Sequence, residues 1–368
     1  MTGSIKLDPT ALAGARLAMT DDPLASIFRM QIQICAAFGS KFYAALMGNA
    51  VADLDHELRS LFTPWEGLAL EPMTAAAVAL RFLGALHDLA LSGDDPALTA
   101  AFPPVSDAEA AWAAARAAIR RDPERFHHFM SHEPQTNEVR RSACLLPGFL
   151  TIAAETGLPL ACLELGASAG LNQLWSRYAY DYGEAGRWGD PASPLLLDSA
   201  WTGPAPPWNA PIRVVSSAAC DRKPIELADP LQLRRLKSYL WPDQTERIER
   251  FDTAVAMALA AGTGVETADA AIWAAERGAP KEGVVTVVYH SIFWQYLPAQ
   301  TQAALRTALE FHGAKATPTS PLAWLRMEPP DGRAIPIELS LTLWPGGETI
   351  RLATVHAHGA SVDWEAPA

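Results

Sequence analysis

Residues 164–172 read ELGASAGLN, a carboxylate followed two positions later by a loop of small residues. The apolar run LACLEL before the loop predicts a buried β-strand, and we expect a helix after it. Glycines at 166 and 170 allow a sharp turn and let a ligand approach the main chain closely. The pattern predicts a strand–loop–helix unit that either binds a cofactor or presents a nucleophile.

The residues inside the loop decide between known phosphate-binding turns. A P-loop requires Lys followed by Ser or Thr, whereas Leu171 and Asn172 follow Gly170, so binding of a nucleoside triphosphate is not expected. The dinucleotide fingerprint requires a second glycine at the position of Ser168, which disfavours NAD and FAD. What remains is an acid followed by two glycines, E-x-G-x-x-x-G.

This motif resembles the first motif of class I S-adenosylmethionine-dependent methyltransferases. The resemblance implies S-adenosylmethionine as the cofactor, bound by a loop that passes beneath it. A small-residue turn is also what any doubly wound fold needs for close packing between strand and helix. On the methyltransferase interpretation, the cofactor-binding residues in the loop are Glu164, Gly166, Ala167, Ser168 and Gly170.

Two further acids stand where the same resemblance expects them. Asp221, in CDRKP after the run PIRVVSS, resembles the G-x-D-x-x-P pattern whose carboxylate binds the ribose hydroxyls. Asp269, in VETADAA, follows the next predicted strand, at the position implied for contacts to the adenine amino group. The alternative role of Asp269 is to cap the helix AAIWAAERG, because Asp is a favoured N-cap residue.

The predicted strand VVTVVYHS ends at His290, which could act as a general base because an unperturbed imidazole titrates near neutrality. The alternative is a buried histidine whose ring nitrogens are satisfied by the protein. The segment after this strand and the polar segment TNEVRR are expected to line the substrate pocket. The pocket residues so predicted are Asn137, Arg141, Ser291, Trp294 and Tyr296.

Gly166–Gly170 also reads as G-x-S-x-G, the nucleophile elbow of α/β-hydrolases. On this hypothesis Ser168 is the nucleophile, Asp269 the acid, and His290, His356 or His358 the base. Two features oppose it, since the region before residue 157 reads as helices and Glu164 has no role in that mechanism. A non-catalytic, ligand-binding member of the methyltransferase fold is the third alternative.

Metal binding is not expected. His128 and His132 are four residues apart, and His356 and His358 alternate along the predicted last strand, but no third ligand stands near either pair. The four cysteines are too widely spaced for a Cys-x-x-Cys motif and are predicted to be reduced thiols.

The chain changes character near residue 157. Residues 1–157 predict a helical N-terminal or cap domain, with inter-helix turns at TPWEG, SGDDP, FPPVSD and SHEPQTN. Residues 158–368 alternate strand runs with helical segments, which predicts a Rossmann-like α/β domain with a doubly wound, mostly parallel, seven-stranded sheet. The last two strands, joined by PGGE, are expected to form an antiparallel hairpin at the edge. Residues 180–211 read as a Trp/Pro-rich insertion in this domain.

Composition limits the partners. The 368 residues carry 29 Lys plus Arg against 41 Asp plus Glu, a net charge of -12 that repels nucleic acid and anionic membranes. No secretion signal or membrane span is expected, so we predict a cytoplasmic protein that acts on a small molecule.

The chain as a whole resembles a bacterial family known as domain of unknown function 2332. The resemblance is carried by QTNEVRR, LELGASAGLN with RYAYDYG, GDPASP, CDRKPIEL, LWPDQTERIER, TVVYHSIFWQYL and HAHGASVDW. It implies a helical N-terminal part joined to a methyltransferase-like sheet, and it names no reaction.

Overall fold

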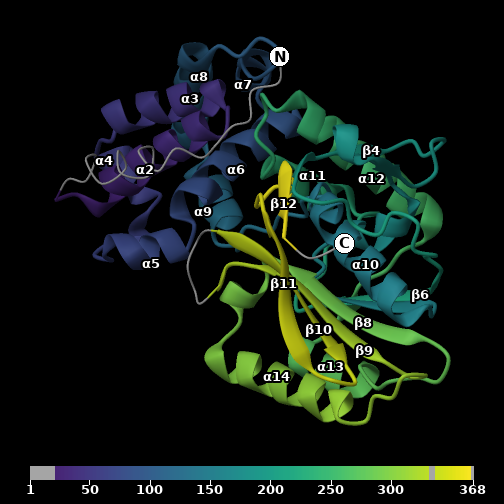
Figure 1. The fold of residues 1–368 in the computed structure, drawn as a ribbon. Helices are drawn as coiled ribbons and strands as arrows, with labels where there is room; N and C mark the ends of the chain where they lie inside the picture. Colours follow the sequence, from purple (N-terminus) through teal and green to yellow (C-terminus); the bar gives the residue numbers. More distant parts are fainter. Residues whose placement is uncertain (1–20, 331–335, 366–368) are drawn as a thin grey trace. The chain divides into compact units, whose positions relative to one another are not determined.

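The computed structural model describes residues 21–330 and 336–365 (Figure 1). The chain forms two compact units. One contains the described residues up to Thr136 together with Asp229–Glu249, and the other contains Asn137–Ala228 and the described residues from Arg250 onward. We expected the helical domain to be continuous to residue 157, but the division falls after Thr136, and the helical unit takes a second segment from the middle of the chain.

Capped helices build the helical unit. An Asp or Ser side chain accepts backbone N–H groups at the start of most of them, for example Ser40 at α3, and this satisfies donors that the first turn leaves unpaired. The four predicted turns all lie between helices. The helices of this unit are α2 (Pro23–Ala37), α3 (Lys41–Ala52), α4 (His56–Ser60), α5 (Leu70–Ala75), α6 (Val78–Ser92), α7 (Pro96–Ala101), α8 (Ala108–Arg121), α9 (Pro123–Met130) and α11 (Pro230–Ser238), with a 3-10 turn η1 at Thr63–Trp65.

The core of this unit surrounds α6, whose Phe82 contacts Phe28 and Phe62 at ring distances of 5.5 Å. In the described part of the chain, the stretch Leu70–Ser92 alone is long and apolar enough to cross a membrane, and 67% of its most apolar window is buried inside the protein. Ala77, in the left-handed conformation, separates α5 from α6. The stretch therefore serves as core of the helical unit.

The second segment is held to α6 by polar contacts as well as by packing. Ser238 offers its carbonyl oxygen to His87 Nδ1 at 3.1 Å, and Arg234 pairs with Asp88 at 2.9 Å. Both partners on α6 are buried. Residues 229–249 are thus an integral part of the helical unit.

The other unit is built on a nine-stranded mixed sheet in the order β5-β12-β11-β10-β9-β8-β1-β6-β7. We expected seven strands, and the seven predicted runs all form strands, but β12 and β5 extend the sheet beyond the predicted hairpin. That hairpin, β10–β11, is antiparallel as predicted and lies inside the sheet rather than at its edge. The strands are β1 (Leu160–Leu165), β5 (Ala200–Thr202), β6 (Val214–Asp221), β7 (Glu266–Thr267), β8 (Val285–Ser291), β9 (Leu322–Glu328), β10 (Ile337–Trp344), β11 (Glu348–Val355) and β12 (Ser361–Trp364).

Strands β7, β6, β1, β8 and β9 are parallel and adjacent in that order. The chain leaves β1 toward β6 on one side and later returns to β8 on the other, so the topological switch point lies between β1 and β8. In open α/β sheets, ligands bind beyond the carboxyl ends of the strands at such a point. The sheet topology therefore places the Gly166–Gly170 loop at the expected ligand site.

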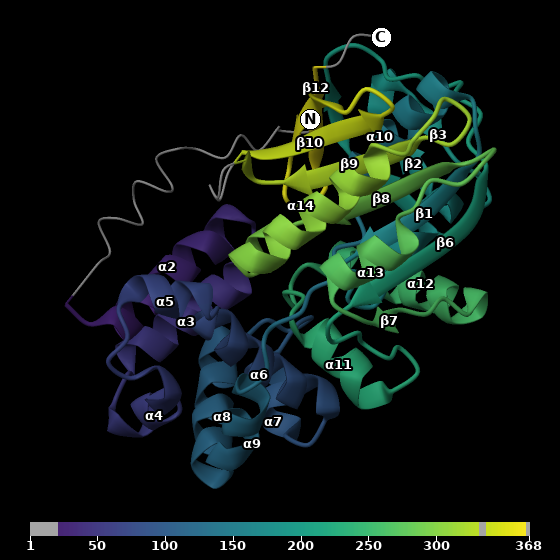
Figure 2. The same cartoon turned by 90° about the horizontal axis from the view of Figure 1, so that it is seen from below.

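Helices cover both faces of the parallel strands. On one face α10 (Arg141–Thr156) approaches so closely at Gly148 that a Cβ there would lie 2.5 Å from Leu325. On the other face α13 (Ala270–Arg277) and α14 (Ala299–Gly313) pack over Leu163 and Trp324 (Figure 2). The long helix α12 (Thr245–Ala261) connects the helical unit back to β7.

We expected an α-helix after the glycine loop, but the described residues 171–178 form none. A 3-10 helix, η2 (Leu171–Arg177), takes its place and leads into the insertion. The insertion carries a small sheet of β2 (Ala179–Asp181), β3 (Arg187–Trp188) and β4 (Leu196–Asp198), and also β5. Its tryptophans pack as one of our two interpretations expected, with Trp201 5.7 Å from Trp208 and 5.6 Å from Trp364 on β12.

Asp243 provides a test of the shared helical unit. Its carboxylate accepts the Ser40 hydroxyl at 2.6 Å and the Phe42 N–H at 3.0 Å, at the start of α3. We expect Asp243→Ala to lower the free energy of unfolding by about 1–3 kcal/mol, because two donors lose a charged acceptor. Lys41→Ala, an exposed change in the same turn, is the control and should have little effect. Equal urea-unfolding midpoints for the wild type and Asp243→Ala would contradict the assignment.

Candidate functional site

The loop after β1 is fixed to β6 by its own backbone. Ala167 N–H donates to the Cys220 carbonyl at 3.1 Å, and Ser168 N–H donates to Asp221 Oδ2 at 2.9 Å. The other carboxylate oxygen of Asp221 accepts Lys223 N–H at 2.8 Å. Asp221 therefore lies beside the loop, as predicted, and it also shapes the loop. Each oxygen retains a lone pair for a further donor.

The polar segment before α10 holds the far end of the loop. Asn137 Oδ1 accepts Leu171 N–H at 3.0 Å, and the Glu138 carbonyl accepts Asn172 Nδ2 at 3.4 Å. Ser142 donates to Asn172 Oδ1 at 2.7 Å. Asn137, predicted to line a substrate pocket, is buried and positions the backbone of the loop.

Two residues with left-handed backbone stand at the carboxyl ends of β1 and β8. Ser168 has φ 55° and Ile292 has φ 49°. This conformation is costly for a side chain with a Cβ and most of all for a β-branched one, so it persists only where the surrounding contacts impose it, commonly at functional sites. Ile292 N–H is held by the Met327 carbonyl at 2.9 Å. Sequence reasoning missed Ile292, because isoleucine gives no signal for this conformation.

The Phe293 ring lies directly on Gly166. A Cβ at Gly166 would be 2.1 Å from Phe293 Cδ2, and Gly166 has φ 65°. Phe293 N–H donates to Glu328 Oε1 at 2.9 Å, which fixes the turn after β8. Glycine is therefore required at 166 both by its conformation and by the aromatic ring that covers it.

Glu164 is enclosed beneath the loop, with 4% of its surface exposed. Burial raises the pKa of its carboxyl group to about 8, and the charge of nearby Asp221 acts in the same direction. The Tyr289 hydroxyl lies 3.3 Å from Glu164 Oε2 and 3.4 Å from the Asn172 carbonyl, and its single proton serves one of them. When Glu164 is protonated, its carboxyl group can donate to the Tyr289 hydroxyl oxygen, and the Tyr289 hydroxyl can then donate to the Asn172 carbonyl.

His290 is fully buried, and both its ring nitrogens have partners. Nδ1 lies 2.6 Å from Glu328 Oε1, and the Trp324 indole N–H donates to Nε2 at 3.1 Å. Because Nε2 accepts, the ring proton resides on Nδ1. In this arrangement neither nitrogen is available to take a proton from a substrate, so the contacts are those of the alternative interpretation, a satisfied histidine.

The other predicted pocket residues divide into two groups. Arg141 donates to the Ser291 carbonyl at 3.2 Å and to the Ala357 carbonyl at 3.0 Å, so Arg141 and Ser291 do meet. Trp294 stacks on His290 with ring centres 5.8 Å apart, on the α14 side of the sheet. Tyr296 is 70% exposed.

Asp269 caps α13, as one of its two predicted roles required. Its Oδ1 accepts Ala271 N–H at 2.9 Å and Ile272 N–H at 3.2 Å. These bonds satisfy first-turn donors of the helix. A contact from Asp269 to adenine stays a prediction.

The arrangement lacks the base that a serine hydrolase needs. Ser168 Oγ is buried and has no hydrogen-bond partner among the described residues, whereas a nucleophilic serine is bonded to its base. His356 Nδ1 accepts His358 N–H at 3.1 Å, and both residues lie between β11 and β12 rather than along a strand.

In residues 21–330 and 336–365, no group of three or more His, Cys, Asp or Glu side chains could hold a metal ion. His132 lies beyond the end of α9, and its Nδ1 bonds the His128 carbonyl at 2.9 Å. The four cysteines are free thiols and are buried.

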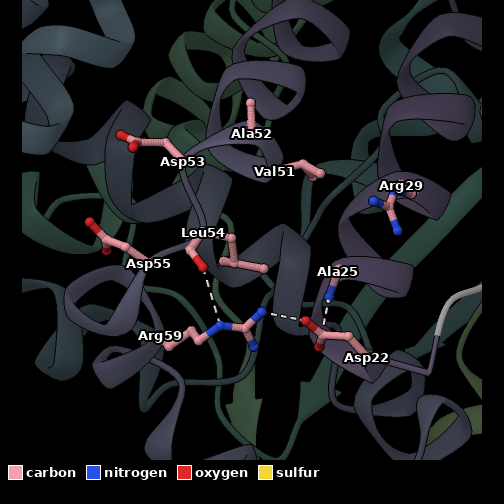
Figure 3. Close-up of a pocket in the computed structure, with 9 residues that line it drawn as sticks. All are labelled: Asp22, Ala25, Arg29, Val51, Ala52, Asp53, Leu54, Asp55 and Arg59. Atoms are coloured by element: carbon pink, nitrogen blue, oxygen red, sulfur yellow. Dashed lines mark hydrogen bonds and ion pairs between the residues drawn. The ribbon is translucent and has the colours of Figure 1, made fainter.

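A hollow of about 410 Å³ opens on the helical unit between α2, α3 and α4 (Figure 3). Arg59 on its floor pairs with Asp22 and donates to the Leu54 carbonyl. The predicted site residues all lie elsewhere. Arg59 forms its ion pair with Asp22 within the hollow, and we assign no chemistry to the hollow.

The fold and the site define a doubly wound α/β protein whose candidate site lies at the topological switch point of its sheet. The chain belongs to the family described as "Uncharacterized protein conserved in bacteria (DUF2332)", which it matches over residues 25–364. This confirms the family resemblance of the sequence motifs. No curated protein and no solved structure matches the chain.

Gly166→Ala and Gly157→Ala form a matched pair. Gly157 ends α10 with φ 63° and has nothing within 4 Å of the position of a Cβ. We expect Gly157→Ala to destabilise the fold by about 1–2 kcal/mol from backbone strain alone. Gly166→Ala should cost about 1–3 kcal/mol more, because Phe293 must also move. Chemical unfolding of both variants measures the difference, and equal values would show that Phe293 does not lie on Gly166.

Glu164 should make stability pH-dependent. Between the ordinary pKa of 4.5 and the folded value of about 8, the folded protein holds a proton that the unfolded chain has lost. Stability from this group therefore falls as pH rises through that window, by an amount on the order of a few kcal/mol. Glu164→Gln should remove this slope in urea unfolding between pH 5 and pH 8, whereas Glu155→Gln, an exposed change on α10, should keep it.

Proposed function

We propose that the sheet unit binds S-adenosylmethionine at the switch point between β1 and β8 and transfers its methyl group to a small-molecule acceptor. One observation carries the proposal. The glycine loop stands at the carboxyl end of the central strand, and Asp221, at the end of the neighbouring strand, is bonded to it. The net charge of -12 supports a small molecule rather than nucleic acid as the partner.

The residues fit this cofactor in three respects. Gly166 and Gly170 place no side chain of their own in the loop, Asp221 can accept from ribose hydroxyls, and the unpartnered hydroxyl of Ser168 is a donor inside the loop. S-adenosylmethionine has no phosphate and therefore needs no anion-binding nest. A cation near Glu164 would also favour its ionised form.

Side chains cover both glycines, with Gln173 and Val265 at Gly170 and Phe293 at Gly166. The Phe293 ring covers Gly166, so the ring must turn aside before a ligand can contact the loop. Phe293 is only partly buried, which leaves room for such a rotation. The proposal therefore includes a rotation of the Phe293 side chain.

Methyl transfer does not require a base when the acceptor is already deprotonated. This suits a site in which His290 is bonded on both nitrogens. Ser168, left-handed in G-x-S-x-G, is the observation that favours the hydrolase alternative, and its lack of a base opposes it. The non-catalytic alternative predicts the same cofactor binding as the methyltransferase proposal but no methyl transfer.

Calorimetric titration with S-adenosylmethionine and S-adenosylhomocysteine, with NAD as the negative control, tests the proposal. We expect micromolar binding of the sulfur compounds. Asp221→Asn should weaken it at least tenfold, Ser168→Ala should change it less than threefold, and Asp190→Asn, an exposed turn aspartate of the same unit, is the control.

Absence of binding to both sulfur compounds would refute the cofactor assignment. Hydrolysis of a generic ester that is lost in Ser168→Ala would then establish the hydrolase. Binding without transfer to any acceptor would leave the ligand-binding alternative.

A further inference from the structure

Two arginines lie against the ring of Trp324 on the α14 side of the sheet. The guanidinium of Arg326, on β9, lies 4.1 Å from the ring centre of Trp324, and that of Arg306, on α14, lies 6.0 Å from it. Arg306 also lies 5.4 Å from the ring of Trp294. Both cations thus lie against the Trp324 ring, which attracts each of them while their charges repel each other.

Neither arginine has an acidic partner in the described part of the chain. Arg326 donates to the hydroxyls of Thr342 at 3.0 Å and Thr349 at 3.3 Å, and its Nε is buried without a partner. Arg306 makes no hydrogen bond or ion pair with a described residue, and it lies against the two tryptophan rings. By comparison Arg277, which also lies on a tryptophan ring, is paired with Glu266 at 2.7 Å.

The nearest acid does not compensate this charge by direct contact. Glu328 acts on Arg326 through space, but its carboxylate is bonded to His290 Nδ1 and to Phe293 N–H. Burial lowers the pKa of Arg326 to about 10, and the charge of Arg306 adds to the effect. Even so, the guanidinium stays charged at neutral pH and needs a counter-charge.

We propose that Arg306 and Arg326 bind the oxyanion of a small-molecule ligand, a carboxylate or a phosphate. Guanidinium groups bind such anions through paired N–H donors. The hydroxyls of Thr342 and Thr349 are bonded to each other at 2.6 Å, which leaves one hydroxyl proton of the pair for an anion. Arg326 is partly exposed and Arg306 is exposed, so a dissolved anion can reach both.

Contacts connect this anion site to the glycine loop. The Trp324 indole donates to His290 Nε2, the His290 ring lies 5.4 Å from Phe293, and Phe293 covers Gly166. This step rests on the proposed function. If the sheet unit transfers a methyl group, the anion site assigns the methyl acceptor to the class of anionic small molecules.

Equilibrium dialysis with radiolabelled orthophosphate and, separately, benzoate tests the site in a low-chloride buffer. We expect saturable binding of one ion per chain. Arg306→Gln and Arg326→Gln should each weaken it at least tenfold, and Arg277→Gln, the acid-paired arginine, should leave it within twofold. The tighter of the two ions distinguishes a phosphate from a carboxylate ligand.

No saturable binding of either ion, or binding that survives in the double variant Arg306→Gln/Arg326→Gln, would overturn the inference. Arg306 is exposed, so its variant is expected to fold even if that of Arg326 does not. Calorimetry with S-adenosylmethionine and dialysis with the two anions, both on the wild-type protein, separate the two proposals. Cofactor binding without anion binding refutes the anion site alone, and anion binding without cofactor binding refutes the methyl-transfer proposal alone.

Discussion

The central strand β1 is buried along its whole length between β6 and β8, and the chain must leave it without exposing unpaired backbone groups to the interior. This constraint determines the turn that follows. Ala167, Ser168 and Leu171 each give their N–H to an acceptor on another segment, two on β6 and one on Asn137. Two glycines and a left-handed Ser168 make the geometry possible. The loop is rigid because it closes the core, and that rigidity suits it to hold a ligand.

The charged groups near this loop show how burial acts differently on acids and guanidinium groups. Asp221 accepts a backbone donor on each carboxylate oxygen, and Glu164 can give its charge up by taking a proton. Arg326 cannot accept hydrogen bonds, because a guanidinium has only donors. It also cannot give up its charge, because it holds its proton far above neutral pH. The anion that we propose would balance the charge of this partly buried arginine, which has no carboxylate partner among the described residues.

Local patterns were sufficient for much of the sheet unit. LAWLRME forms β9 residue for residue, PGGE joins an antiparallel hairpin, and the glycine loop follows β1 as its spacing predicted. The 3-10 helix after the loop was not foreseen, since tertiary contacts from Asn137 and Ser142 override the helical expectation there. Likewise β5 pairs with β12 across about 160 positions, and the pairing of Arg306 with Arg326 depends on packing that no short motif encodes.

The helical unit takes residues from both sides of a long stretch of sheet unit, and this has a consequence for the order in which the protein can be made. Asp243 and Ser40 are 203 positions apart, and His87 has its carbonyl partner at Ser238. Domains generally fold from the N-terminus as the chain leaves the ribosome. Here the first helices emerge with a gap along α6 that stays open until residues 137–228 of the sheet unit have been synthesised. The nascent chain therefore carries an apolar surface during that interval, and a chaperone can bind it.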